Sequence, residues 1–241
     1  SLEKFLIESY NEFGTDKLFN RSNHNEKLTL LTYLSNCLYK TKKYKQSLKY
    51  SEELLSGMKE YDCFLHDKYL FYYYNILVLN YAKTDKEKAL DYLNKASRSE
   101  VITKLPSYNA FIYLNHSLIY YYQNNFKESQ KNIARLIMQE DFLLLDKSFQ
   151  LKILVTELMI RMLVSNKNLD DKIAGINKNY KSLLLEENYI REKKMIDLIF
   201  KKISDGDVVD NKEDLLSSMS DSDSEDIDII SYNIWIKENI K

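Results

Sequence analysis

The sequence predicts an all-α fold, and three observations lead to that prediction. Apolar residues recur at steps of three and four, which is the spacing of one helix face. Only four Gly and one Pro occur in 241 residues, too few for the many tight turns of an all-β fold. A helix–turn–helix pattern also repeats along the chain. We therefore expect an α-solenoid of about four helical hairpins with flanking helices, because each hairpin can bury its apolar stripe only against its neighbours.

Residues 2–13 are expected to form a helix before the repeats, and Gly14 is expected to end it. Its apolar residues fall at helical spacing: Leu2, Phe5, Leu6, Tyr10 and Phe13. Residues 15–27 then read as a polar connection.

The first hairpin, residues 28–55, is the unit that the later ones repeat. A leucine stripe at Leu31, Leu34 and Leu38 predicts its first helix, and a polar turn follows at 41–43. A second apolar stripe then begins at Tyr44.

Two small residues of this hairpin, Ser35 and Ser47, are expected to meet where its two helices cross and to allow a close approach. Gly57 is expected just past the end of the second helix, where the left-handed backbone conformation favours glycine.

Three further hairpins repeat the pattern, with turns at 84–85, 124–125 and 166–168. The position that follows each turn on the second helix recurs every 40 to 43 residues and is small in the first three hairpins: Ser47, Ala89, Ser129 and, in the fourth, Lys172. Gly175 lies inside the fourth helical pattern, where glycine costs about 1 kcal/mol relative to alanine, so we expect a close helix crossing there.

The third hairpin carries a resemblance to the tetratricopeptide repeat (TPR) family. Ser117 stands for the family's glycine, Tyr120 for its tyrosine, Phe126 follows the turn, and Ser129 stands for its alanine. The glycine and the closing proline are absent from all four copies, and the period exceeds the family's ~34 residues. The resemblance implies a right-handed, TPR-like solenoid over residues 1–203, in which the first helices of successive hairpins line a concave groove.

The groove that this resemblance implies would bind a protein or an extended peptide. Asn75 and Asn115 occupy matched places in neighbouring hairpins, and an asparagine amide can both donate to and accept from a peptide backbone. The predicted groove residues are Tyr33, Asn36, Tyr39, Tyr74, Asn75, Tyr81, Asn115, Tyr121 and Tyr122. Asn36 and Asn75 also match two positions of the family's carboxylate clamp. Uncharged residues replace the clamp's cations, so we do not expect capture of a C-terminal carboxylate.

The C-terminal part changes composition twice. Residues 186–203 are amphipathic and suit a helix that shields the last repeat. Residues 204–226 are rich in Asp, Glu and Ser and read as an acidic linker. Residues 227–241 are apolar again, contain the only Trp, and read as a docking segment or cap. We expect this segment to cover the end of the solenoid, with occupation of the tyrosine-rich groove as the alternative.

No motif indicates catalysis. His24, His66 and His116 lie on separate elements without metal-ligand spacing, and the scattered glycines cannot form a phosphate loop. The formal net charge of −1 does not favour nucleic acid or an anionic membrane, and no stretch is long and apolar enough to span one.

Two cysteines are too few to stabilise a domain of this size by disulfides and favour a reducing compartment. We therefore predict a non-catalytic protein- or peptide-binding scaffold in the cytoplasm, with no cofactor and no metal. The alternative is an effector-peptide-sensing domain of a larger signalling or transcriptional regulator.

Overall fold

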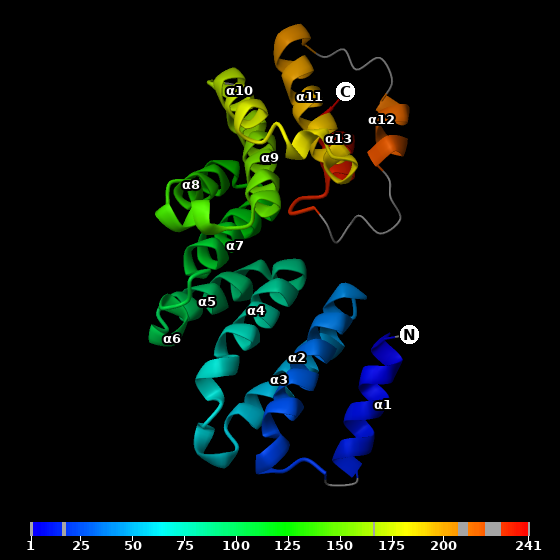
Figure 1. Ribbon diagram of the computed structural model, residues 1–241, viewed down its shortest axis with the longest axis vertical. Coiled ribbons are helices and arrows are strands. Elements are labelled where there is room, and N and C mark those ends of the chain that lie inside the picture. The colour runs from blue at the N-terminus through cyan, green and yellow to red at the C-terminus, as the bar shows by residue number, and fades with distance from the viewer. Residues whose placement is uncertain (1, 16–17, 166, 207–211, 220–227, 241) are drawn as a thin grey trace. The chain divides into compact units, whose positions relative to one another are not determined.

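The fold is entirely helical in the part of the chain that the computed structural model describes, residues 2–15, 18–165, 167–206, 212–219 and 228–240. Helices make up 83% of these residues, which contain no strand. The predicted all-α class is therefore confirmed. The chain divides into two compact units, residues 1–108 and 109–241 (Figure 1).

Unit 1 consists of two helical hairpins with one helix before them and a short helix after them. Its helices are α1 (Leu2–Thr15), α2 (His24–Lys40), α3 (Tyr44–Met58), α4 (His66–Thr84), α5 (Lys86–Ser97) and α6 (Glu100–Thr103), with 3-10 turns at Arg21–Asn23 and Tyr61–Cys63. The pairs α2/α3 and α4/α5 are the first two predicted hairpins, and their turns lie at the predicted positions. Helix α4 packs against both α2 and α3.

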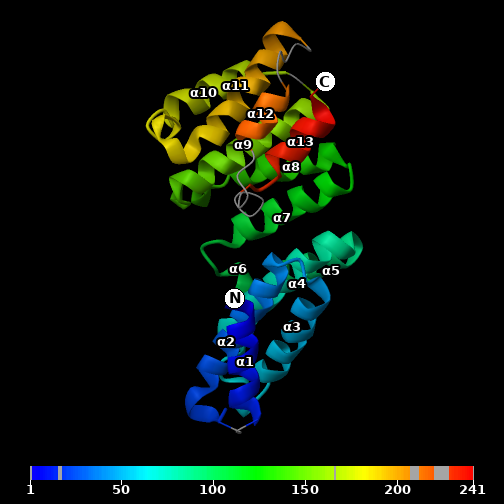
Figure 2. The same ribbon diagram turned by 90° about the vertical axis from the view of Figure 1, so that its right-hand side faces the viewer.

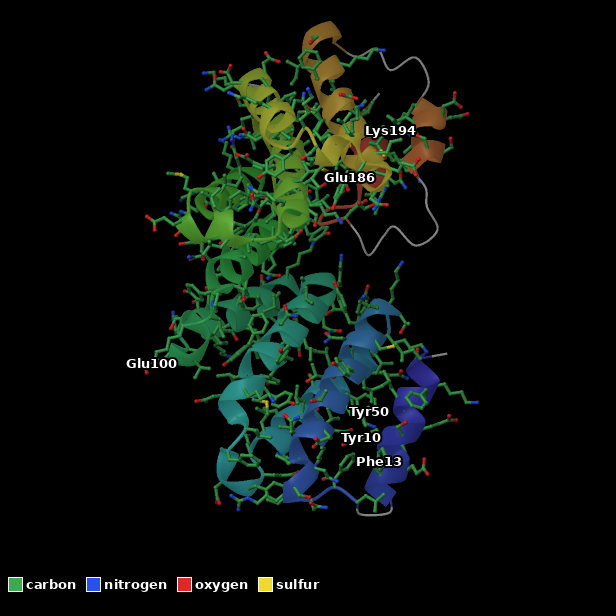
Figure 3. The ribbon with its side chains drawn as sticks, viewed as in Figure 1. Tyr10, Phe13, Tyr50, Glu100, Glu186 and Lys194 are labelled. Atoms are coloured by element: carbon green, nitrogen blue, oxygen red, sulfur yellow. The ribbon has the colours of Figure 1, made fainter. Side chains whose placement is uncertain are left out.

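Helix α1 covers the outer side of the first hairpin. Leu6 packs with the buried Leu34 and Leu38. The Tyr10 and Tyr50 rings point toward each other from α1 and α3, with ring centroids 5.9 Å apart in an edge-on arrangement (Figure 3). Apolar contacts thus tie α1 to both helices of the hairpin.

Unit 2 contains two more hairpins followed by three helices. Its helices are α7 (Tyr108–Tyr122), α8 (Phe126–Ile137), α9 (Lys147–Val164), α10 (Leu169–Asn179), α11 (Ile190–Asp205), α12 (Lys212–Met219) and α13 (Tyr232–Asn239), with 3-10 turns at Glu140–Leu144, Leu183–Leu185 and Glu187–Tyr189. The pairs α7/α8 and α9/α10 are the third and fourth predicted hairpins. The final amphipathic helix, expected from residue 186, begins at Ile190 after the two short turns.

Small residues hold the crossings of the paired helices, as predicted. In the first hairpin, the Ser47 hydroxyl donates to the Ser35 carbonyl at 2.8 Å. In the third hairpin, Ser117 and Ser129 each donate to the other's carbonyl, at 2.9 and 2.8 Å. All four serines are fully buried, so the helices approach closely enough for side chain and backbone to bond directly.

The turns end where a side chain can cap the next helix. Asp85 accepts from the Lys88 N–H at the start of α5, Asn125 from the Glu128 N–H at the start of α8, and Asp146 from the Ser148 N–H at the start of α9. Each cap satisfies one of the backbone donors that a helix N-terminus leaves unpaired.

Two glycine predictions are wrong, for different reasons. Gly57 does not follow α3 in a left-handed conformation; it lies in the last turn of the helix. A Cβ at this position would meet Cδ2 of the fully buried Leu28 at 2.7 Å, so an alanine here would force the Leu28 side chain to shift. Gly175 has no atom within 4 Å of the place a Cβ would take, so no close crossing explains it.

The described parts of the predicted acidic linker include a helix. Helix α12 lies within residues 204–226, and its Met219 is buried. Residues 207–211 and 220–227, which hold most of the remaining linker, lie outside the described residues. The apolar segment that follows forms α13, which packs beside α12 in unit 2 (Figure 2).

Candidate functional site

Helices α2 and α4, the first helices of the two hairpins of unit 1, run parallel and side by side. Near their N-terminal ends, the buried Tyr69 of α4 donates its hydroxyl hydrogen to the Asn25 carbonyl of α2 at 2.9 Å. Near their C-terminal ends, Asn80 of α4 donates at 2.9 Å to the Ser47 hydroxyl, which itself bonds the Ser35 carbonyl of α2. These contacts at both ends fix the register of the two helices.

This register aligns a Tyr-x-x-Asn sequence on each helix. Tyr33 and Asn36 lie on α2, and Tyr72 and Asn75 lie on α4 at the same interval of three, which places each pair on one side of its helix. We call these four residues the tyrosine–asparagine face. Tyr33 is 61% exposed and Tyr72 is 44% exposed.

Tyr69, three residues before Tyr72 on α4, is the buried neighbour of that exposed tyrosine. Its ring centroid is 6.0 Å from that of Tyr72. Burial raises the pKa of Tyr69, and its hydrogen bond with Thr29 opposes that rise. Tyr72 therefore lies beside the contact that Tyr69 makes between α4 and α2.

The two asparagine amides of the face differ from the other asparagines nearby. Asn36 and Asn75 are half-buried, and their side chains make no hydrogen bond within the described part of the chain. Asn80, by contrast, donates to the Ile76 carbonyl and the Ser47 hydroxyl, and Asn115 of unit 2 donates to the Phe111 carbonyl of its own helix at 2.8 Å. The Asn36 and Asn75 amides thus keep both donor and acceptor for a partner.

Several predicted groove tyrosines contact aromatic residues of their own hairpins, and their place in a groove stays a prediction. Tyr39 of α2 lies 5.9 Å from the Tyr44 ring of α3, and Tyr81 of α4 stacks on Tyr92 of α5 at 5.4 Å. Tyr74 lies beside Tyr73.

The same holds in unit 2. There the buried Tyr121 of α7 lies 5.7 Å from Phe126 of α8 and contacts Tyr122. Aromatic residues at the ends of first helices thus contribute to hairpin packing.

Tyr33, Asn36 and Asn75 hold matched places on α2 and α4, and Tyr72, which was not among the predicted groove residues, holds the place on α4 that matches Tyr33. The signal for Tyr72 was present, because Tyr33 and Tyr72 are separated by the same 39 residues as Asn36 and Asn75. Asn75 belongs to unit 1 and Asn115 to unit 2. A groove common to both therefore stays a prediction.

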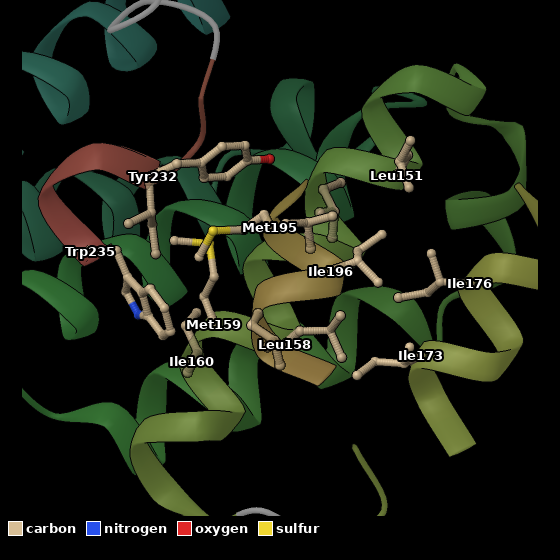
Figure 4. Packing of buried hydrophobic residues seen from close by; sticks show 14 of the residues in the cluster. Leu151, Leu158, Met159, Ile160, Ile173, Ile176, Met195, Ile196, Tyr232 and Trp235 are labelled. Atoms are coloured by element: carbon tan, nitrogen blue, oxygen red, sulfur yellow. The ribbon is translucent and has the colours of Figure 1, made fainter. Parts of the chain in front are cut away.

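In unit 2, helix α13 packs on a surface formed by α7 and α9, the first helices of its two hairpins, and by the following helix α11. Trp235 of α13 is fully buried beside Met159 and Ile160 of α9, and Tyr232 packs near Met195 of α11 (Figure 4). Tyr121 of α7 belongs to the same core; burial raises its pKa, and the nearby Glu238 carboxylate of α13 raises it further. We call this surface the α13 dock.

Charged residues hold both ends of the docked segment. At its start, the Arg191 guanidinium binds the Asp228 carboxylate through two hydrogen bonds of 2.9 and 2.7 Å and lies 5.3 Å from the centre of the Tyr232 ring. At its end, Lys202 donates to the Asn239 carbonyl at 2.9 Å, and Lys212 donates to the Ile240 carbonyl. Cations are favoured here because the last carbonyls of a helix carry partial negative charge.

A buried carboxyl group, that of Glu192, lies beside Tyr232 at the N-terminal end of α13. Glu192 of α11 is 2% exposed, and burial raises its pKa. It accepts a hydrogen bond from the Tyr232 hydroxyl, whose pKa is also raised by burial and by the negative charges of Glu192 and Asp228.

The histidines do not converge on a site. His24 is buried at the start of α2 against the Tyr61 ring, at 4.9 Å, and desolvation lowers its pKa. His116 is half-buried and bonds the Ile112 carbonyl of its own helix. Among the described residues, no three His, Cys, Asp or Glu side chains are placed to hold a metal ion. None of the described helices is long and apolar enough to cross a membrane.

Comparison with known protein families, with characterised protein sequences and with solved structures gave no match. The resemblance to TPR proteins therefore stays a prediction, and the proposal below is based on the geometry of the described residues.

Proposed function

We propose that this protein is a non-catalytic protein- or peptide-binding scaffold of the cytoplasm, built as a right-handed TPR-like solenoid. The observation that supports it is the tyrosine–asparagine face of unit 1. Two exposed tyrosines and two unengaged asparagine amides lie in matched positions on adjacent parallel helices.

The spacing of this face suits an extended backbone. Packed helices have axes about 8–10 Å apart, and an extended chain advances about 3.3 Å per residue. The Asn36 and Asn75 amides can therefore bond peptide groups two or three residues apart in one bound segment. Amides bind any backbone, whereas the Tyr33 and Tyr72 rings offer apolar area with a polar tip to the side chains between them.

A pull-down from cells of the source, read by mass spectrometry, tests the proposal. The Asn36→Ala/Asn75→Ala double variant should lose at least nine-tenths of the recovered partner (about 1.4 kcal/mol of binding free energy per tenfold) and keep its melting temperature. Asn94→Ala is the matched control, because Asn94 is exposed on the second helix α5.

Partner recovery that is equal for wild type, the double variant and the Asn94 control would rule out the tyrosine–asparagine face as the binding site.

A further inference from the structure

We propose that the α13 dock is a second binding surface, which receives an amphipathic helix of a partner protein, and that α13 is its displaceable internal occupant. The inference rests on the proposed function, because it treats the surface of α7, α9 and α11 as a binding face, as is proposed for α2 and α4 of unit 1. The partner helix would carry a carboxylate ahead of its N-terminus and a large aromatic side chain seven positions later.

The contacts of α13 define this chemistry. Asp228 is 2% exposed at its side chain and bonds Arg191 with both oxygens, while Asp228 also accepts from the Tyr232 N–H at 3.2 Å. Trp235, seven residues later, fills the apolar centre of the dock with Ile236 beside it, both fully buried. A partner needs the same pairing, because Arg191 would otherwise be left buried without its anion.

With α13 docked, three buried polar atoms at this surface are left without a hydrogen bond among the described residues. The Trp235 indole N–H, the Asn233 side-chain oxygen and the Arg191 Nε are buried and have no hydrogen-bond partner among the described residues. A buried donor without an acceptor weakens the contact that contains it. A partner helix that offers an acceptor to Arg191 Nε, or an aromatic ring without an N–H, removes that defect and can compete with α13.

Helix α13 also depends on the dock for its structure. It has eight residues, fewer than the ~12–15 that an isolated helix needs to be marginally stable in water. A partner helix would occupy the surface that Tyr232, Trp235 and Ile236 fill, so docking of α13 and docking of a partner exclude each other.

Hydrogen exchange of the full-length protein gives the first test. If α13 leaves the dock while the rest of unit 2 stays folded, amides of 235–239 should show protection factors at least tenfold lower than those of 155–160 in α9. Equal protection in the two segments would mean that α13 opens only when unit 2 unfolds, and would overturn the proposal.

Displacement by a peptide gives the second test, also on the unmodified chain. Trp235 is the only tryptophan, so its emission reports the state of α13. The probe is a synthetic peptide of residues 228–241 with Trp235→Phe, which does not emit as tryptophan. A segment of the same chain competes at an effective concentration of roughly millimolar, so half-displacement and a red shift of the Trp235 emission are expected at about millimolar peptide.

Two single-charge variants of the probe serve as a pair. The Asp228→Asn peptide should be at least tenfold weaker, because it cannot pair with Arg191, and the Lys237→Gln peptide should match the parent, because the Lys237 side chain is exposed. A lack of red shift with the parent peptide, or equal shifts with the Asp228→Asn peptide, would overturn the proposal. Neither test involves unit 1, so failure here is distinguishable from failure of the pull-down with the Asn36 and Asn75 variants.

Discussion

Single small residues decide how closely the paired helices of this protein pack. Ser35, Ser47, Ser117 and Ser129 are fully buried polar residues, and each crossing is closed by a hydroxyl that bonds the facing backbone. A larger apolar side chain at these positions would fit the apolar pattern of the helix. It would not fit into the space between the paired helices. The volume of the side chain is therefore the property that matters at these positions.

Replacing Ser117 with leucine should destabilise unit 2. The added side chain cannot fit between α7 and α8, and the two reciprocal hydrogen bonds with Ser129 are lost. We expect a loss of about 1–3 kcal/mol from overpacking alone, measured by denaturant unfolding.

Ser56→Leu on the exposed side of α3 is the control and should stay within about 0.5 kcal/mol of wild type. Equal stability of the two variants would show that the crossing at Ser117 is not tightly packed.

Two helical glycines should respond to alanine in opposite directions. Gly175→Ala in α10 meets open space and should stabilise by about 0.5–1 kcal/mol, because alanine is the better helix former. Gly57→Ala places its Cβ 2.7 Å from the fully buried Leu28, and the overpacking should outweigh the same gain. Thermal melts of both variants provide the measurement; a rise in melting temperature for Gly57→Ala would contradict the packing described here.

At the scale of elements, α13 shows how a short helix obtains its structure from its surroundings. Its Tyr232, Trp235 and Ile236 are buried in the core of unit 2, and Arg191 and Lys202 of α11 hold its two ends. Helix propensity contributes little to so short a segment. Contacts with residues far away in the sequence therefore determine whether α13 forms.

Trp235→Ala should release α13 while the hairpins of unit 2 stay helical. Truncating a fully buried tryptophan costs about 3–5 kcal/mol. Ile234→Ala changes the neighbouring residue, which is 51% exposed, and should cost far less. Chemical unfolding followed by circular dichroism compares the two, and similar losses for both would argue against the central place of Trp235 in the dock.

The stability of unit 2 should depend on pH through Glu192. Its folded-state pKa is raised by burial, so the stability that its protonated form contributes is complete below the pKa of the unfolded chain, about 4.3, and is lost as the pH rises through the folded-state value. Glu192→Gln keeps an acceptor for the Tyr232 hydroxyl without the charge, and should raise the melting temperature at pH 7.

That advantage of Glu192→Gln should shrink as the pH is lowered toward about 4, the ordinary pKa of a glutamate. Glu187→Gln, at an exposed position, is the control and should show no pH-dependent difference from wild type. A Glu192→Gln advantage that grows in acid would have the wrong sign for a buried carboxylate.

At the scale of the whole molecule, the chain is organised as two compact units with the same internal plan. Each unit contains two helical hairpins. Unit 1 exposes the tyrosine–asparagine face on α2 and α4, and unit 2 covers the surface of α7, α9 and α11 with its own helix α13. The same hairpin pattern therefore presents an exposed surface in unit 1, the tyrosine–asparagine face, and a covered surface in unit 2, the α13 dock.

The far-ultraviolet circular dichroism spectrum of the full chain should be that of an almost wholly helical protein. The described residues are 83% helix, and helix pairs extend through both units. A spectrum dominated by strand would contradict the all-helical fold.

The positions of the paired helices and their turns could be predicted from the sequence alone. Apolar spacing, the small residues at Ser35 and Ser47, and turn residues such as Asp85 and Asn125 all act within a few dozen residues. Helical periodicity and capping are local properties, so their signals survive in the linear chain.

The roles of individual surface residues were decided by the tertiary structure. Spacing alone could not separate Tyr72, which is exposed, from Tyr81, which stacks on Tyr92. It also could not show that a Cβ at Gly57 would meet Leu28, or that the last apolar segment meets α9 and α11 through Arg191, Met159 and Met195. The burial of a residue depends on which distant segment packs against its helix face. An apolar stripe in the sequence does not specify that segment.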